Sequence, residues 1–172
     1  MQSKAFPQML ERRKVAIFLG ATCAYSTGVF GQNSSKNSTK ERFLPTPASL
    51  QATARLATQK GEPLVILVSL PGCPWCELLR RNYLLPMRGE GVHAFQITVN
   101  DGTTVVADFA GNPSSGQHIT DLYKAKMNPT LLFFNARGEE IAPRIVGVAS
   151  TELIGNQIDQ SLQTARAVLR KT

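Results

Sequence analysis

Residues 63–76 have the sequence Pro-Leu-Val-Ile-Leu-Val-Ser-Leu-Pro-Gly-Cys-Pro-Trp-Cys. The run 63–70 is short, continuous and rich in branched apolar residues, which is typical of a strand buried on both faces. The run 77–85, Glu-Leu-Leu-Arg-Arg-Asn-Tyr-Leu-Leu, predicts a helix that stops before Pro86. The two cysteines, three positions apart, therefore share one face of the first turn of this helix.

These cysteines are well placed for redox chemistry. The thiol of Cys73 is expected at the positive end of the helix dipole, near unpaired backbone N–H groups, and both effects favour the thiolate. Cys76 is close enough in the chain to form a disulfide with it. The pattern therefore indicates a dithiol redox centre made of Cys73 and Cys76.

Other uses of a Cys-x-x-Cys pair fit the sequence less well. A zinc site needs two more cysteine or histidine ligands, and the chain offers only Cys23, His93 and His118, which are far apart in the sequence. A haem-attachment motif would need histidine where Glu77 stands. A purely structural disulfide would close a loop so short that it removes little chain entropy. We therefore expect no metal and no cofactor.

Length and composition indicate one globular domain. The chain has 172 residues, of which 42% are hydrophobic, and this is enough for one packed core. The net charge is +7, and part of the excess lies in the first 31 residues. The remainder is only mildly basic and has no arginine stripe interleaved with aromatic residues, so we expect no nucleic-acid partner.

Residues 1–31 have the features of an export signal. Basic residues precede an apolar run at 15–24, and Val29-Phe30-Gly31 offers a cleavage site. Retention as a single membrane anchor is the alternative, although the uncharged span at 15–32 is only marginally long enough to cross a membrane. Cleavage would leave Cys73 and Cys76 as the only thiols, which suits an oxidising compartment. We therefore expect a periplasmic location.

The segment after the export signal is polar, and periodic patterns resume beyond it. Residues 32–45 predict a flexible tether, which leaves 46–172 as the folded domain. The next predicted elements are a helix at 47–60, a strand at 92–99, a loop or insertion at 101–117 with brief order at 105–109, and a helix at 119–127.

The C-terminal part begins with a proline that opens a strand. Pro143 suggests that the second strand of this part lies at a sheet edge, and Ser150 is a suitable N-cap for the last helix. The predicted elements are a strand at 128–134, a hairpin turn at 135–138, a strand at 140–147 and a helix at 151–170.

In this order of elements the chain resembles the thioredoxin superfamily. The motifs that carry the resemblance are GCPWC at 72–76, NPTLLFF at 128–134 and RGEE at 137–140, followed by Gly147. The resemblance covers about residues 45–170 and is closest to periplasmic thioredoxin-like proteins of the SoxW and Dsb kind. It implies an α/β fold of the thioredoxin type, with a central mixed β-sheet flanked by helices.

The resemblance also implies roles for the motif residues. Cys73 would attack a substrate disulfide, and Cys76 would resolve the mixed disulfide. Pro129 would be a cis-proline facing both sulfurs, which leaves the backbone of Asn128 free to pair with substrate. An ordinary trans proline that opens the strand is the alternative. The residues expected to line the site and bind substrate are Pro74, Trp75, Asn128, Pro129 and Thr130.

The chain departs from the thioredoxin pattern in three places. Thioredoxins carry tryptophan directly before the first cysteine and a buried acid six residues before it, where this chain has Gly72 and Leu67. That acid helps to move the proton of the resolving thiol, so Glu77 or water would have to serve instead. The segment 101–117 is longer than a small thioredoxin needs, and a surface insertion is favoured over a substrate-facing lid. We expect Trp75 to be exposed beside the sulfurs.

The leading hypothesis is a periplasmic thiol:disulfide oxidoreductase that exchanges disulfides with protein substrates through the Cys-Pro-Trp-Cys dithiol. One alternative is a redox-inactive module that holds a partner or a copper ion through the dithiol. A glutaredoxin-like enzyme is another. The chain has no room for the dimerisation domain of periplasmic isomerases, and we expect a monomer.

The direction of electron flow follows from the charges near Cys73. No ionisable residue lies between the cysteines, and Arg80 and Arg81 are expected to be strongly screened by solvent. The thiolate would then depend on the helix dipole and local N–H groups alone. We expect a reduction potential of about −180 to −240 mV. The protein would then act as a reductant recharged by a membrane electron donor or a thiol partner.

Overall fold

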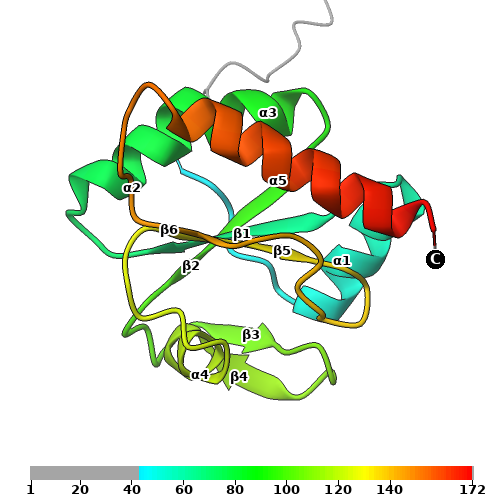
Figure 1. Ribbon diagram of the computed structural model, residues 1–172. Coiled ribbons are helices and arrows are strands. Elements are labelled where there is room, and N and C mark those ends of the chain that lie inside the picture. Colours follow the sequence, from blue (N-terminus) through cyan, green and yellow to red (C-terminus); the bar gives the residue numbers. More distant parts are fainter. Residues whose placement is uncertain (1–42, 172) are drawn as a thin grey trace, which may run out of the picture. The chain divides into compact units, whose positions relative to one another are not determined.

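The computed structural model describes residues 43–171. The expected signal peptide or anchor at 1–31 lies outside this range, as does all but the end of the expected tether at 32–45. Four strands form the main sheet in the order β2-β1-β5-β6 (Figure 1). Their bounds are Leu64–Ser69 (β1), His93–Thr98 (β2), Thr130–Phe134 (β5) and Ile145–Val146 (β6).

β1 is the buried strand that the apolar run predicts, and it lies between β2 and β5. All six of its residues are buried. β1 pairs in parallel with β2 and antiparallel with β5, and β5 pairs antiparallel with β6. The predicted α/β class, with a mixed central sheet flanked by helices, is therefore confirmed.

Helices cover both faces of the sheet (Figure 1). One face packs against α2 (Pro74–Leu79), α3 (Leu85–Gly89) and α5 (Ile154–Leu169). The opposite face packs against α1 (Leu50–Gln59) and α4 (Gly116–Leu122). Alternate residues of β1 point to the two cores, as the two-residue period of a strand requires. Val65 and Leu67 belong to the first core, and Leu64, Ile66 and Val68 to the second.

The helix after Cys76 does not stop before Pro86, so this prediction is wrong. It widens into a π-helical turn, η1 (Arg80–Leu84), and continues as α3. The N–H of Leu85 reaches the carbonyl of Arg80, five residues back. Pro86 then lies in the first turn of α3, a position that tolerates a residue without an N–H.

The segment 101–117 is more ordered than predicted. β3 (Val105–Ala107) and β4 (Pro113–Ser115) form a separate two-stranded antiparallel sheet. The N–H of Ala107 donates to the carbonyl oxygen of Ala48 at 2.9 Å. This bond ties the hairpin to the chain just before α1.

The helix expected at 119–127 is displaced towards the N-terminus. α4 starts at Gly116 because Ser115 caps it, with Oγ accepting from the N–H of His118 at 3.2 Å. Glycine is required at the first position, since a Cβ atom there would lie 2.4 Å from the carbonyl oxygen of Thr98.

The predicted hairpin turn after β5 is confirmed, but the next strand is short. The N–H of Gly138 donates to the carbonyl of Asn135 at 3.1 Å. Of the predicted strand at 140–147, only β6 pairs continuously, together with an isolated bridge at Glu140. Pro143 has no N–H to give to the ladder. β6 lies at the sheet edge, as predicted.

The last helix begins three residues later than predicted. Ser150 was expected to cap a helix from Thr151, but α5 starts at Ile154. The Ser150 hydroxyl instead accepts from the N–H of Glu152 at 3.3 Å. It therefore stabilises the turn before the helix.

The ordered fold includes the end of the expected tether. Leu44 is buried in the first core. The carbonyl oxygen of Pro45 accepts from the N–H of Gln96 at 3.0 Å. The domain therefore includes at least two residues before position 46.

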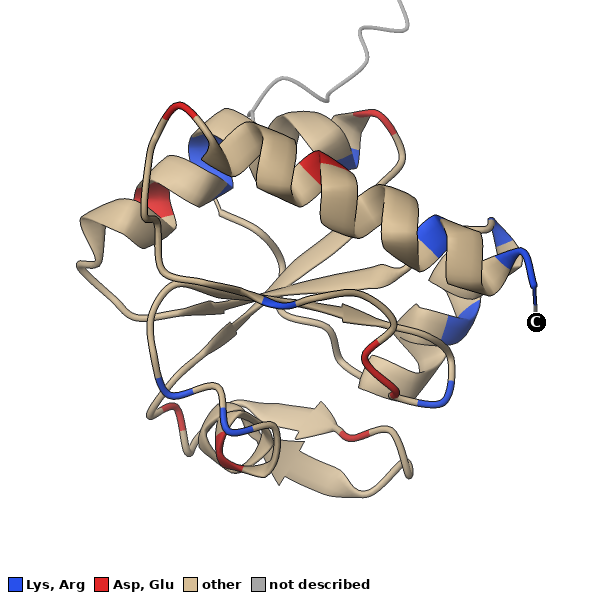
Figure 2. Ribbon diagram, in the orientation of Figure 1, with Lys and Arg blue, Asp and Glu red and all other residues tan. Residues whose placement is uncertain are grey.

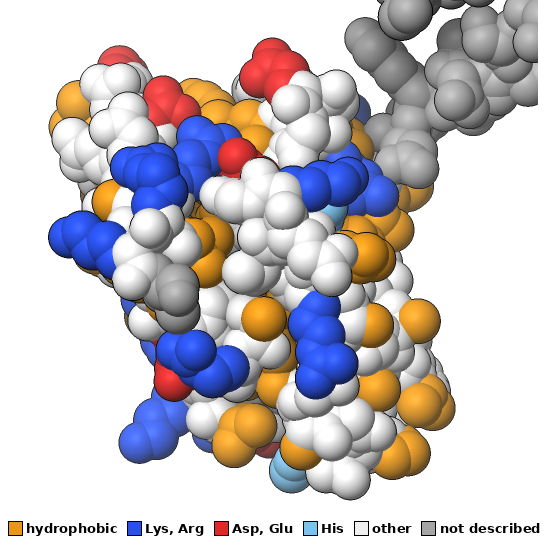
Figure 3. Space-filling view, turned by 90° about the vertical axis from the view of Figure 1, so that its right-hand side faces the viewer, with side chains coloured by type: hydrophobic (Ala, Val, Ile, Leu, Met, Phe, Trp, Pro, Cys, Tyr) orange, Lys and Arg blue, Asp and Glu red, His pale blue; other side chains and the backbone are white. Residues whose placement is uncertain are grey.

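Charges are nearly balanced in the part of the chain that the structure describes. Residues 43–171 carry 12 Lys and Arg against 10 Asp and Glu, spread over helices and loops (Figure 2). On the face in Figure 3, basic side chains alternate with apolar and uncharged ones. In the same described range, no helix is both long and apolar enough to cross a membrane.

Candidate active site

Cys73 and Cys76 form a disulfide at the start of α2, with their Cα atoms 5.3 Å apart. Cys73 is the N-cap of this helix, and its Sγ accepts a hydrogen bond from the N–H of Cys76 at 3.2 Å. Pro74 follows at the first helical position, which suits a residue without an N–H. The predicted sulfur at a helix N-terminus is therefore confirmed.

The turn before the helix explains Gly72. Its φ is +75°, in the left-handed region that favours glycine. The N–H of Cys73 donates to the carbonyl of Leu70 at 3.2 Å, which closes the turn. A tryptophan at position 72 would be held in a strained backbone conformation.

The two sulfurs have different surroundings. Cys76 is only 1% exposed, whereas Cys73 is partly exposed. Trp75, between them, is 48% exposed, as predicted. An incoming disulfide therefore has access to Cys73 and not to Cys76.

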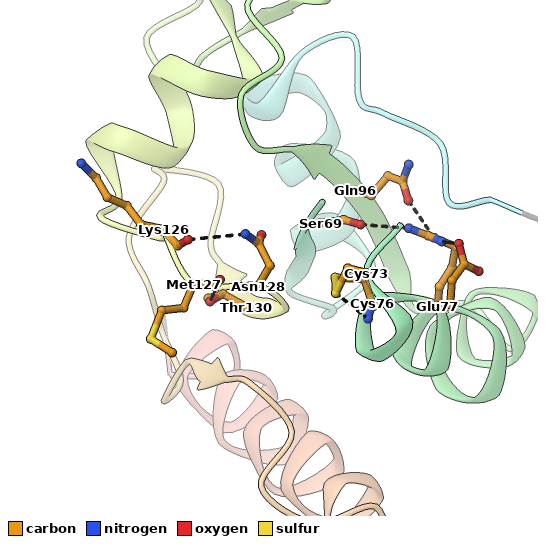
Figure 4. Close-up of a disulfide and its surroundings, with 10 residues drawn as sticks. Ser69, Cys73, Cys76, Glu77, Gln96, Lys126, Met127, Asn128 and Thr130 are labelled. Carbon is orange, nitrogen blue, oxygen red and sulfur yellow. Dashed lines mark hydrogen bonds and ion pairs between the residues drawn. A yellow bond between two sulfur atoms is a disulfide. The ribbon is translucent and has the colours of Figure 1, made fainter. Parts of the chain in front are cut away.

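The Asn128–Pro129 peptide bond is cis, as predicted. Thr130 pairs with Val68, so Pro129 lies at the end of the sheet where β1 leads into the cysteine loop. Figure 4 shows Asn128 on one side of the cysteine pair and Glu77 on the other. The structure thus brings the Asn128-Pro129-Thr130 segment close to the loop that carries Cys73 and Cys76. Direct contact between Pro129 and the two sulfurs stays a prediction.

The side chain of Asn128 lines a polar pocket of about 230 Å³ beside the cysteine loop. Leu70 contributes to its wall, and Gln117 and Asp121 of α4 face it. The amide nitrogen of Asn128 donates to the carbonyl of Lys126 at 3.4 Å. Its Oδ1 is buried and has no hydrogen-bond donor among the described residues.

Exposed apolar side chains occur on the segments around the disulfide. Besides Trp75 they are Leu70, Met127 and Val146, which are 38%, 66% and 48% exposed. A second, open groove of about 550 Å³ runs between Leu70, Pro71 and residues 98–103. The start of the 101–117 segment therefore borders the cysteine loop.

Asp101 carries a negative charge at the edge of this groove. Hydrogen bonds from Thr104, and then from Thr103, hold the pKa of Asp101 well below its usual value. The carboxylate is therefore ionised throughout the physiological pH range.

Arg80 is buried, contrary to the expectation that solvent screens it. Its residue exposure is 4%. The guanidinium donates from Nε to Oε1 of Gln96 at 2.9 Å and from Nη2 to Oγ of Ser69 at 2.9 Å. Only Arg81 is exposed as expected, with 54% of its side chain accessible.

The proton route proposed from the sequence is altered by these contacts. Leu67 is fully buried where the thioredoxin pattern has an acid. Oε1 of Glu77 lies 2.5 Å from Nη1 of Arg80, and Oε2 lies 3.0 Å from Nε of Arg81. Both carboxylate oxygens of Glu77 are thus engaged by guanidinium groups.

Sequence reasoning missed Ser69 and Gln96. Ser69 is the one polar residue in β1, and this was an available signal. Gln96 is the parallel-strand partner of Leu67, a pairing that no local pattern reveals.

No cluster of three or more His, Cys, Asp and Glu side chains in residues 43–171 is placed to hold a metal ion. Two sulfurs in bonding distance at a helix N-terminus, one accessible and one buried, are suited to opening and closing a disulfide.

The sequence model of the thioredoxin-like domain family matches residues 50–162. No curated protein matches the chain. Among solved structures, it is similar to oxidised mitochondrial thioredoxin 3 from Saccharomyces cerevisiae, with 15% identity, 70% of this chain and 93% of that chain covered, and a TM-score of 0.44. It is also similar to a thioredoxin from Malassezia sympodialis, with 18% identity, 69% and 90% coverage and a TM-score of 0.44. A thioredoxin-fold protein from Helicobacter pylori has 16% identity, 70% and 92% coverage and a TM-score of 0.37.

Proposed function

The chain belongs to the thioredoxin-like domain family, and on this basis we propose that it is a thiol:disulfide oxidoreductase acting on protein substrates. The observation that carries the proposal is the Cys73–Cys76 disulfide at the N-terminus of α2, with the Cys73 sulfur accepting the N–H of Cys76. Such a hydrogen bond stabilises a thiolate more than a thiol.

In the reducing direction the exchange has two steps. The thiolate of Cys73 attacks one sulfur of a substrate disulfide, forms a mixed disulfide and releases the other substrate sulfur as a thiolate, which takes a proton from water. The thiolate of Cys76 then attacks Sγ of Cys73 and releases the second substrate sulfur. One protein dithiol becomes a disulfide, and one substrate disulfide becomes two thiols.

The surface around the cysteines supports a protein as substrate. Leu70, Trp75, Met127 and Val146 offer apolar contacts, and the groove between Leu70, Pro71 and residues 98–103 is open rather than closed around a small molecule. An extended or unfolded segment with exposed apolar side chains would find apolar contacts on such a surface.

The compartment and the electron source form the remaining part of the proposal. The export features of residues 1–31 support a periplasmic location. In that compartment a reductant needs a supply of electrons, and we assign this role to a membrane electron donor or a thiol partner. Fractionation of cells that express the full chain, with N-terminal sequencing of the product, tests the location.

Insulin reduction driven by dithiothreitol tests the activity. The full chain should accelerate precipitation of the insulin B chain, and a Cys73→Ser, Cys76→Ser double variant should not. Equal rates for the two proteins would indicate a redox-inactive binding module. A preference for a glutathionylated peptide over insulin would favour a glutaredoxin-like enzyme.

A further inference from the structure

A buried guanidinium lies on the helix that carries the cysteines. The side chain of Arg80 is only 5% exposed. Its guanidinium donates to Ser69 and Gln96 at 2.9 Å each and to Glu77 at 2.5 Å. In Figure 4 the dashed lines from these three labelled residues meet at this guanidinium. The ring of Phe43 lies 5.7 Å from its Cζ atom. Since all three guanidinium nitrogens are bound, the charge is fixed in one place.

Arg80 lies on the same buried side of the helix as Cys76. The N–H of Arg80 donates to the carbonyl of Cys76, one turn earlier. Side chains four positions apart on a helix are neighbours, with Cβ atoms about 5–6 Å apart. Cys76 is 1% exposed and Arg80 4%. Ser69 ends β1 just before the loop that leads to Cys73.

Few other charges face this position in the described part of the chain. Glu77 and Arg81 follow Cys76 on the same helix. The groups that β1 and β2 present there, Ser69 and Gln96, are uncharged. On the loop before Pro129, the side chain of Lys126 is 75% exposed, and its ammonium lies 3.5 Å from the carboxylate of Asp121. Arg80 is therefore the buried cation of this region.

Cys76 needs such a charge more than Cys73 does. Cys73 has a backbone N–H at its sulfur and access to water. Cys76 is buried, and burial disfavours the thiolate that must attack the mixed disulfide. Position 67 offers no acid to accept its proton, and Glu77 is held by two arginines.

We propose that Arg80 is a positioning residue that stabilises the thiolate of Cys76 in the second step of exchange, and that Glu77 moderates its charge. The proton of Cys76 passes to water. The thiolate forms the bond to Sγ of Cys73, and the substrate sulfur leaves as a thiolate. The catalytic role of this step depends on the proposed function, whereas the effect of Arg80 on the thiol does not.

A thiol titration tests the electrostatic effect. In a full-length Cys23→Ser, Cys73→Ser background, Cys76 is the one remaining thiol, and its ionisation is followed by the ¹³Cβ chemical shift against pH. Arg80→Met should lower the thiolate-to-thiol ratio at a given pH about tenfold, which is a shift of about one pH unit in the midpoint. Glu77→Gln should raise the thiolate-to-thiol ratio, because it removes the negative charge that partly neutralises Arg80.

The neighbouring arginine supplies the matched control. Arg81→Met removes an exposed partner of the same Glu77 and should change the ratio less than twofold. Arg80→Lys should restore part of the effect. The proposal is overturned if Arg80→Met and Arg81→Met give the same midpoint. If circular dichroism shows that Arg80→Met does not fold, Glu77→Gln decides alone, and an unchanged or lowered ratio rejects the proposal.

A second measurement connects the thiol to exchange. The Cys23→Ser variant keeps both Cys73 and Cys76. Its reduced form should react with one equivalent of a chromogenic aromatic disulfide in two phases, which stopped-flow absorbance follows: attack by Cys73 releases the first aromatic thiol, and resolution by Cys76 releases the second. Arg80→Met should slow the second phase about tenfold at neutral pH and the first phase less than twofold. An unaffected second phase would exclude the role in resolution. If the protein does not reduce insulin but the Cys76 thiol titrates as expected in the variants, the proposed function is rejected. The effect of Arg80 on the ionisation of Cys76 would still stand.

Discussion

The backbone N–H of Cys76 donates a hydrogen bond to Sγ of Cys73 at 3.2 Å. The backbone of Cys76 thus stabilises the sulfur of Cys73, while the sulfur of Cys76 itself is buried. The two thiols of the reduced protein should therefore differ in reactivity, because nucleophilic thiolate and solvent access both belong to Cys73.

Single cysteine variants should show this division of roles. Cys76→Ser should accumulate mixed disulfides between Cys73 and substrate proteins, because the resolving thiol is lost. Cys73→Ser should trap no substrate, and its exchange rate should fall by about a hundredfold or more. Non-reducing gels and mass spectrometry of the trapped species measure both outcomes. Trapping by Cys73→Ser rather than by Cys76→Ser would reverse the assignment.

The sequence was sufficient for the features that depend on local patterns. The continuous apolar run at 63–70 could only be satisfied in the middle of a covered sheet, and it forms β1. The helical spacing of Ile154, Ile158 and Leu162 predicts the buried face of α5. The Cys-x-x-Cys pair and the Asn128–Pro129 bond were identified by motif.

The two errors on the helix after Cys76 have different causes, a local widening of the helix before Pro86 and contacts with distant strands at Arg80. A proline usually ends a helix, but the widened turn η1 lets Pro86 fall in a fresh first turn. Arginine side chains are mostly exposed in proteins, but Ser69 and Gln96, from two strands of the sheet, supply Arg80 with buried partners. The pairing of β1 with β2, which brings Gln96 towards this helix, is not visible in any local pattern.

Trp75 should matter for protein substrates and not for small disulfides. It is 48% exposed next to both cysteines, so a bound protein can cover its ring. Trp75→Ala should lower the insulin reduction rate about fivefold, equivalent to about 1 kcal/mol of lost contact. Reaction with a small aromatic disulfide should change less than twofold. Leu56→Ala, on α1 and 57% exposed, is the control. Equal losses on both substrates would mean that Trp75 acts on the dithiol itself.

Gly138 should tolerate no side chain. Its φ is +80°, and a Cβ atom would lie 2.5 Å from Cγ of Phe109. Gly61 has a similar φ of +74° with open space around the added Cβ, so Gly61→Ala should show only the cost of the left-handed backbone, about 1–2 kcal/mol. Gly138→Ala should lower the free energy of unfolding by at least about 1 kcal/mol more than Gly61→Ala, as measured by urea denaturation. Equal values would show that Phe109 moves aside freely.

The ion pair between Glu62 and Arg166 should stabilise the packing of α5 against the start of β1. Nε and Nη2 of Arg166 both donate to the Glu62 carboxylate at 2.9 Å, and the two side chains are 33% and 21% exposed. Two-point geometry and partial burial make such a pair stronger than a typical surface pair. Arg166→Ala should lower the free energy of unfolding by about 1 kcal/mol at low salt and by less at 1 M salt.

Arg170→Ala is the matched control, because it removes the same charge from an exposed position near the end of this helix. It should lower the free energy of unfolding by less than about 0.5 kcal/mol. Equal losses for the two variants would show that net charge, rather than the bridge to Glu62, determines the effect.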